Sequence, residues 1–141
     1  MLFPKFYECV EAITYIAMNS GAKPVSSKDL CKHLGVMPRH FEPIMQQLVH
    51  YGILIGSKGP YGGYTLAREK RKITLSELFD ISNLREKSKS TISNIDKTII
   101  ANIDKLIEGE VIKILSDLTI ENLCKKIVSS AGQENKPDFA I

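Results

Sequence analysis

The segment at residues 58–64, Lys-Gly-Pro-Tyr-Gly-Gly-Tyr, constrains the possible folds of this chain more than any other segment. It follows one short apolar run at residues 53–55 and leads into another at residues 64–67. Glycine and proline favour tight turns, so the two runs and the segment between them predict a β-hairpin. Helical patterns precede and follow the hairpin, which is therefore a small element in a mainly α-helical chain.

Three helices are predicted before the hairpin. The first covers roughly residues 4–19, and the second starts after a serine cap at Ser26 and stops at Gly35. The third helix is expected to begin around residues 38–40. Because Pro43 would remove a backbone hydrogen bond inside it, the helix proper is expected to start late, near Phe41, or to be irregular there. Its expected buried face is Phe41, Ile44, Met45, Leu48 and Val49.

A long amphipathic helix is predicted after the hairpin region, because apolar residues recur at helical spacing from residue 92 to residue 116. An isoleucine-rich stripe of this length is unfavourable in water, so we expect it to be buried against a second copy of the chain. The predicted dimer-interface residues are Ile95, Ile99, Ile103, Leu106 and Ile107.

These patterns divide the chain into four parts. A helical domain with the hairpin occupies residues 1–80, and a polar linker occupies residues 81–91. The dimerisation helix and a terminal helix occupy residues 92–130, and residues 131–141 are expected to be a flexible tail.

Positive charge is concentrated in the first half of the chain. Residues 22–72 contain nine lysines and arginines against three acidic residues, a net charge of +6, so the rest of the chain carries −3 of the total of +3. Such an excess on one face can displace counterions from a phosphate backbone. The alternative is a solvated basic surface with no partner.

Several classes of protein do not match the sequence. No apolar run is long enough to span a bilayer, and the first residues lack the order of a signal peptide. Three scattered cysteines do not form a disulfide framework, so a cytoplasmic protein is expected. The chain has no P-loop, metal-ligand spacing or nucleophile elbow, and we predict that it is not an enzyme.

Residues 25–78 resemble the Rrf2 family of winged helix-turn-helix regulators. The most specific match is the hairpin, where the family pattern Arg-Gly-x-x-Gly-Gly-Tyr-x-Leu-Ala corresponds to residues 58–67, with Lys58 in place of the arginine. The resemblance implies a winged helix-turn-helix domain followed by a long dimerisation helix. It also implies a homodimer that binds double-stranded DNA in a sequence-specific way.

The same resemblance implies that the third helix enters the major groove and that the hairpin tip contacts the minor groove or the backbone. Arg39 would donate to guanine and Glu42 would accept from cytosine, although Glu42 also suits a helix start without any role in recognition. His40 replaces an aromatic residue of the family and is expected to pack. The predicted DNA-binding residues are Lys28, Arg39, Glu42, Lys58, Gly59, Tyr61, Gly62 and Gly63.

The best-known relatives hold an iron–sulfur cluster with three cysteines before the long helix, and this chain departs from them. It has no cysteine between Cys31 and Cys124, so no cofactor and no metal are predicted. The three cysteines, Cys9, Cys31 and Cys124, each lie on or beside an apolar helical face, so they are expected to be buried structural thiols. Whether any of them is redox-active is left open. The predicted function is a repressor without a cluster, and the alternative is a protein-interaction module that has lost DNA binding.

Overall fold

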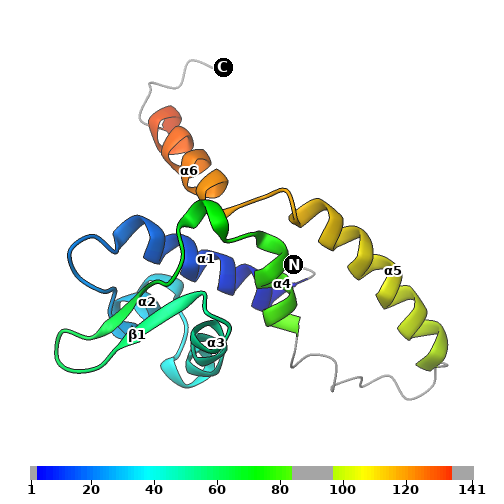
Figure 1. Cartoon of the computed structure of the whole chain (residues 1–141), viewed down its shortest axis with the longest axis horizontal. Helices are drawn as coiled ribbons and strands as arrows, with labels where there is room; N and C mark the ends of the chain where they lie inside the picture. The colour runs from blue at the N-terminus through cyan, green and yellow to red at the C-terminus, as the bar shows by residue number, and fades with distance from the viewer. Residues whose placement is uncertain (1–2, 84–96, 135–141) are drawn as a thin grey trace.

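A computed structural model of the chain describes residues 3–83 and 97–134. Within these residues, the chain forms six α-helices and a single two-stranded hairpin, which lies at one edge of the molecule beside α2 and α3 (Figure 1). The predicted mainly α-helical class with a small β-hairpin is therefore confirmed. None of the described helices combines the length and the apolar character that a membrane span requires.

The first three helices form the core of the N-terminal half. They are α1 (Pro4–Asn19), α2 (Ser27–Leu34) and α3 (Pro38–His50). The Ser26 side chain caps α2 by accepting a 3.1 Å hydrogen bond from the Asp29 N–H, and Gly35 ends α2 with a φ of +67°. The fully buried side chains at the centre of this core include Ile13, Ile16, Leu30, Phe41, Met45 and Leu48.

α3 begins within the range 38–40 that the sequence predicts, and not later. It starts at Pro38 and continues through Pro43, so the expectation of a late start near Phe41 was wrong. Pro38 is well suited to the first helical position, because its missing N–H would have no partner there anyway. The first turn is tight, since the His40 N–H donates to the Met37 carbonyl at 3.0 Å. α3 is therefore continuous across Pro43.

The hairpin pairs β1 (Leu54–Ser57) with β2 (Gly63–Leu66) in antiparallel register, from Leu54 opposite Leu66 to Ser57 opposite Gly63. A third segment joins its edge, because Val25 and Tyr64 exchange two backbone hydrogen bonds of 3.0 and 2.8 Å. These two bonds attach the hairpin to the residue that precedes the cap of α2.

A short 3-10 turn, η1 (Lys70–Lys72), leads into α4 (Leu75–Asn83). A capping box starts α4, since the Thr74 N–H donates to the Glu77 carboxylate at 3.1 Å and the Glu77 N–H donates back to the Thr74 hydroxyl at 3.4 Å. Residues 81–83, expected to begin the linker, form the last turn of α4 instead. The rest of the predicted linker lies outside the described residues.

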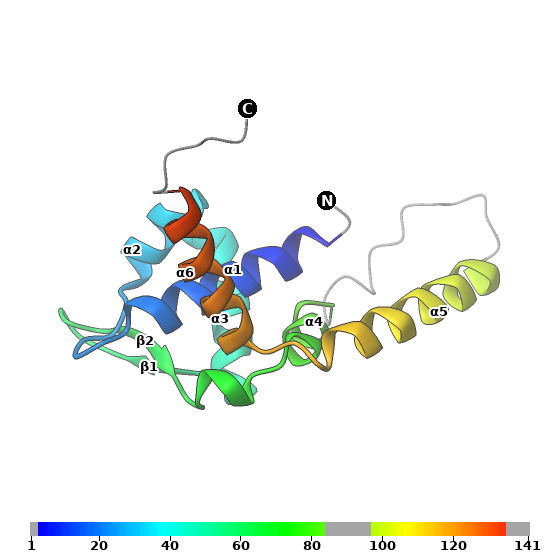
Figure 2. The same cartoon turned by 90° about the horizontal axis from the view of Figure 1, so that it is seen from above.

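The C-terminal part consists of α5 (Lys97–Leu115) and α6 (Ile120–Glu134). α5 extends away from the body and contacts it near its C-terminal end through Val111, Ile112 and Leu115 (Figures 1 and 2). α6 packs on α1. Between α5 and α6, the Leu118 carbonyl accepts a 2.9 Å hydrogen bond from the Leu75 N–H at the start of α4. The tail was predicted from residue 131, but residues 131–134 continue α6.

Candidate nucleic-acid interface

A groove of about 540 Å³ lies between α3, the N-terminus of α2 and the hairpin. Gln46 and Val49 line it from α3, Ser27 lines it from α2, and residues 56–59 and 62–64 line it from the hairpin. Three elements that are separate in the sequence therefore surround one surface feature, which is open to solvent.

One exposed face of α3 borders this groove through Gln46 and Val49. Arg39, Glu42, Gln46 and Val49 follow one another at intervals of three and four residues, which places them on one side of a helix, and all four are exposed. The opposite side carries His40, Pro43, Ile44 and Gln47, which line a second cavity against α1 and α4. His40 was expected to pack as the family's aromatic residue does, but it is exposed at the edge of that cavity.

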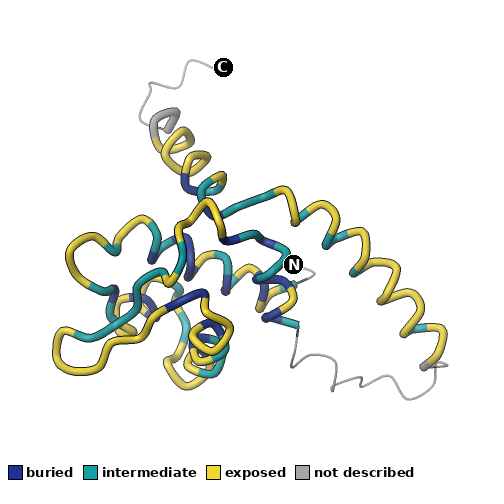
Figure 3. Tube along the Cα trace, viewed as in Figure 1, coloured by how far each residue is buried: buried dark blue, intermediate teal, exposed yellow. Residues whose placement is uncertain are grey.

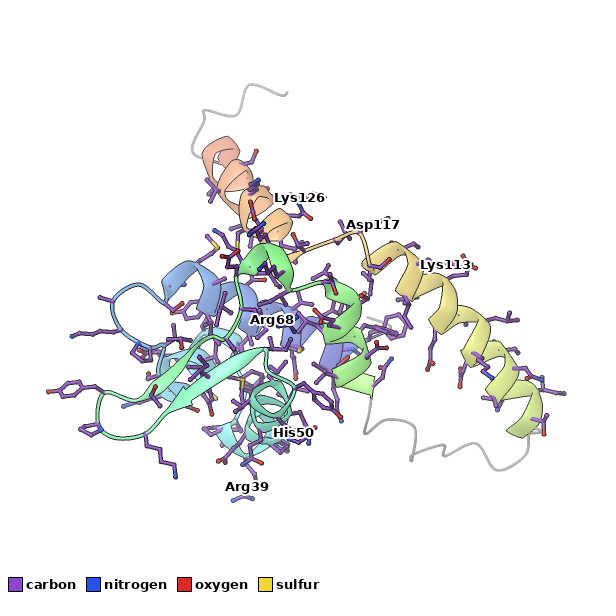
Figure 4. All side chains as sticks on the ribbon, in the orientation of Figure 1. Arg39, His50, Arg68, Lys113, Asp117 and Lys126 are labelled. Carbon is purple, nitrogen blue, oxygen red and sulfur yellow. The ribbon has the colours of Figure 1, made fainter. Side chains whose placement is uncertain are left out.

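The predicted DNA-binding residues are distributed around the groove. Lys58, Gly59, Gly62 and Gly63 line it directly. The others are exposed nearby: Lys28 in the first turn of α2, Arg39 and Glu42 in the first half of α3, and Tyr61 at the hairpin tip. Tyr61 is 82% exposed, and Figure 4 shows Arg39 directed away from the body.

The glycines of the hairpin are required by contacts within the chain. A Cβ atom on Gly63, which has a φ of +156°, would lie 2.2 Å from the Val25 carbonyl oxygen. A Cβ atom on Gly62 would lie 2.3 Å from the Ser57 carbonyl oxygen. The structure therefore explains both glycines by the close approach of the chain's own backbone. Their contact with DNA stays a prediction.

Gly56 is different, because a Cβ atom there would meet only the Tyr64 ring, at 3.6 Å, and Val49 at 4.0 Å. These are ordinary van der Waals contacts, so the fold does not require glycine at this position. The missing side chain leaves room in the groove itself.

Tyr64 of β2 lies close enough to Glu42 of α3 and Cys31 of α2 for both to affect its ionisation. Burial raises the pKa of the Tyr64 hydroxyl, and the Glu42 carboxylate and then Cys31 raise it further. The hydroxyl therefore stays protonated at neutral pH and can donate a hydrogen bond at the wall of the groove.

Six residues that line this groove were not among the predicted DNA-binding residues: Ser27, Gln46, Val49, Gly56, Ser57 and Tyr64. Val49 was expected in the core, yet it is 38% exposed and lines the groove. Gln46 was recoverable, because it continues the helical spacing that starts at Arg39 and Glu42. Ser27 and Gly56 carry no such signal, since only the folded chain places them opposite α3.

The basic residues do not form one face. Arg68 is turned inward, where it donates to the Glu77 carboxylate at 3.0 Å and to the Gly52 and Lys72 carbonyls (Figure 4). η1 lies against α6, where its lysine and arginine lower the pKa of Glu121 after the larger effect of Lys125. The basic residues that remain on the α2, α3 and hairpin half are Lys23, Lys28, Lys32, Arg39 and Lys58.

The predicted dimer-interface residues form an uncovered apolar face on α5. The exposed fractions are 55% for Ile99, 49% for Ile103, 73% for Leu106 and 48% for Ile107 (Figure 3). Ile95 lies outside the described residues. An apolar stripe of this kind on an extended helix is typical of a surface that another chain covers.

Comparisons with known proteins agree with this architecture. A family model described as "Rrf2: Iron-dependent Transcriptional regulator" matches residues 5–126. The HTH-type transcriptional regulator IscR of Escherichia coli is 30% identical over 69 residues, which cover 49% of this chain and 43% of that protein. The chain thus aligns with less than half the length of this relative.

Two solved structures share the fold. The structure of T. potens IscR matches with a TM-score of 0.65 and 20% identity, over 95% of this chain and 90% of that chain. The structure of CymR, described as the global cysteine regulator of B. subtilis, matches with a TM-score of 0.66 and 20% identity, over 86% and 94% of the two chains.

The iron named in the family description can be tested against the available ligands. Cys9, Cys31 and Cys124 lie on three different helices and are all buried, and burial raises the pKa of Cys9 to about 12. Iron–sulfur clusters bind thiolates, which such burial disfavours. Residues 84–96 contain neither cysteine nor histidine, and no group of three potential ligands converges among the described residues. This set of residues does not fit a cysteine-held cluster.

Proposed function

Because the chain belongs to the Rrf2 family of transcriptional regulators, we propose that it binds double-stranded DNA in a sequence-specific way as a homodimer. The observation that carries this proposal is the groove that separates the exposed face of α3 from the hairpin. In a winged helix-turn-helix, the recognition helix enters the major groove. The hairpin then reaches the neighbouring minor groove or the backbone.

The shape of the groove suits the DNA strand between these two contacts. A sugar–phosphate strand separates each major groove from the next minor groove, so it must pass between α3 and the hairpin. The hydroxyls of Ser27 and Ser57, the Lys58 ammonium and the Gln46 amide line this space and can donate to phosphate oxygens. Gly56 leaves the room that the strand needs.

Base reading is assigned to the face of α3 that begins at Arg39. An arginine donates well to guanine, a glutamate accepts from cytosine, and a glutamine pairs with adenine. Arg39, Glu42 and Gln46 present these three chemistries on successive turns of one helix face. They are therefore the residues expected to set the sequence preference.

The hairpin tip is assigned to backbone or minor-groove contact through Lys58, Gly59 and Tyr61. Lys58 offers a compact positive charge where the family has a planar guanidinium, so we expect a smaller contribution to sequence preference from this position. Gly62 and Gly63 shape the turn that presents these residues.

The dimer is assigned to α5. Its exposed residues Ile99, Ile103, Leu106 and Ile107 can be covered by the same residues of a second copy, since a two-fold interface uses one patch twice. Ile95 would extend the interface towards the start of the helix. Pairing of the α5 helices would also set the spacing between two half-sites on DNA.

We further propose that regulation does not use an iron–sulfur cluster, because the cysteines are buried on separate helices. The dimer would act as a repressor by occluding promoter DNA. A reporter gene placed downstream of the bound sequence tests the sign of regulation.

Selection from a random pool of double-stranded DNA tests the central proposal. We expect enrichment of a palindromic sequence, and we expect Arg39→Ala to lower affinity for it and to relax its sequence preference. Arg71→Ala is the matched control, because Arg71 lies in η1, away from the groove, and forms an ion pair with Glu69. Folded protein that enriches no sequence would favour the alternative of an interaction module. Equal effects of the two variants would contradict the assigned interface.

A further inference from the structure

Met37, the residue directly before α3, has an unusual environment for an apolar side chain. It is 67% exposed, and of the large apolar side chains in residues 3–83 only that of Tyr61, at the hairpin tip, is more exposed. Val36 before it packs against the hydrophobic core, and Phe41 four residues later is buried. The side chain of Met37 therefore lies outside the core, although its neighbours on both sides contribute to it.

Met37 also suits the start of a helix poorly. It is the N-cap residue of α3, with a φ of −76° and a ψ of 138°, and its side chain makes no capping hydrogen bond. Serine, threonine, asparagine and aspartate are preferred at this position, because their side-chain oxygen accepts from an N–H of the first turn. Ser26 does this at the start of α2. Neither the core nor the helix start explains a methionine at position 37, which points to a contact outside the chain.

The start of α3 projects from the body of the protein. Residues 37–40 are all exposed, and the first buried residue of the helix is Phe41. Arg39, two residues after Met37, is directed away from the body (Figure 4). In a helix-turn-helix, the N-terminal residues of the recognition helix contact base edges in the major groove. Met37 lies at this end of α3.

The edges of the bases in the major groove offer one apolar group to such a side chain, the C5-methyl group of thymine. Arg39, Glu42 and Gln46 match guanine, cytosine and adenine by hydrogen bonding, so none of them accounts for thymine. Methionine is unbranched and polarisable, and it adapts its shape to an apolar partner. The chemistry of Met37 thus complements that of the three polar residues.

From these observations we propose that Met37 contacts the methyl group of a thymine in the half-site that Arg39 reads, and so contributes to the sequence preference. This inference rests on the proposed function and adds a base-reading residue to it. Burial of one methyl group corresponds to a preference of about fourfold for thymine over uracil in each half-site.

The test replaces each thymine of the selected DNA sequence in turn by deoxyuridine, which pairs as thymine does and lacks only the methyl group. At one position in each half-site, the unchanged chain should lose affinity about fourfold. Met37→Ala should bind the thymine and uracil forms of this position equally, and Met37→Leu should keep most of the preference. Met18→Ala should keep all of it, and it is the matched control because Met18 is the other exposed methionine of residues 3–83 and lies on α1.

Met37→Ser separates a contact with DNA from a role in folding. A serine at the N-cap of α3 can accept a hydrogen bond from the N–H of Arg39 or His40, so the midpoint of urea unfolding should rise. The preference for thymine over uracil should be lost in the same variant. A methionine that serves the fold would give the opposite result for stability.

Three results would overturn the inference. The first is a selected half-site in which no thymine methyl group affects affinity, and the second is an equal preference for thymine in Met37→Ala and in the unchanged chain. The third is a lower unfolding midpoint in Met37→Ser. The protein still binds DNA in all three cases, so the proposed function stands. A folded protein that selects no DNA sequence contradicts the proposed function, and this inference falls with it.

Discussion

Replacement of Gly63 by alanine tests the attachment of the hairpin to the helix-turn-helix. The new methyl group would lie 2.2 Å from the Val25 carbonyl oxygen and 2.9 Å from the Ser26 nitrogen, both of which are backbone atoms. Backbone cannot move aside as a flexible side chain can, so the two hydrogen bonds between Val25 and Tyr64 must break or the hairpin must shift. Gly56→Ala is the matched control, since its nearest neighbour is the Tyr64 ring at 3.6 Å.

The magnitude follows from two contributions. A non-glycine residue at the φ of Gly63 costs about 1–3 kcal/mol of backbone strain. Loss of the Val25–Tyr64 hydrogen bonds costs about 0.5–1.5 kcal/mol for each bond. Because breaking the bonds relieves part of the strain, we expect a decrease of about 2–4 kcal/mol in the free energy of unfolding. For Gly56→Ala we expect a change within about 0.5 kcal/mol, as for other surface substitutions.

Urea unfolding measures this difference. With a slope of about 2 kcal/mol per molar urea, the midpoint of Gly63→Ala should fall by roughly 1–2 M, and that of Gly56→Ala should hardly move. DNA affinity should fall in both variants, because alanine at position 56 narrows the groove without disturbing the fold. Equal midpoints for the two variants would refute the argument that Gly63 is required by the contact with Val25.

Four other predictions concern charge, assembly, ionisation and the basic residue that turns inward. The logarithm of the DNA association constant should fall against the logarithm of salt concentration with a slope of about −4 to −5, for roughly five phosphate contacts per dimer, and a slope near zero would contradict the interface. Ile99→Asp combined with Ile103→Asp should give monomers in sedimentation, whereas Lys105→Asp on the same helix should remain dimeric. The free energy of unfolding should fall as pH rises above about 9, because the thiol of Cys9 ionises in the unfolded chain but stays protonated in the native protein, where burial raises its pKa to about 12. If the free energy of unfolding of Cys9→Ala fell just as steeply with pH, this reasoning would be contradicted. Arg68→Gln should lower stability by about 1 kcal/mol in thermal unfolding and leave DNA affinity unchanged, since its partners lie within the protein; a selective loss of DNA binding would place Arg68 in the interface instead.

The sequence by itself determined the features that depend on neighbouring residues. The cap at Ser26 and the capping box of Thr74 and Glu77 form between residues three positions apart, so their spacing alone predicts them. The hairpin was predicted for the same reason, since its turn residues lie between two short strands. The order of the elements and the mainly α-helical class follow from these local signals and from the apolar periodicity.

Only the tertiary structure decided which side of each element is covered. Val49 and His40 occupy α3 positions whose environment depends on the hairpin, α1 and α4, so helical spacing could not show that both are exposed. Likewise, the need for glycine at position 63 comes from Val25, which is distant in the sequence and reaches it only when the chain folds. Local hydrogen bonds are encoded by spacing, whereas burial and close approach are properties of pairs of elements that meet in space.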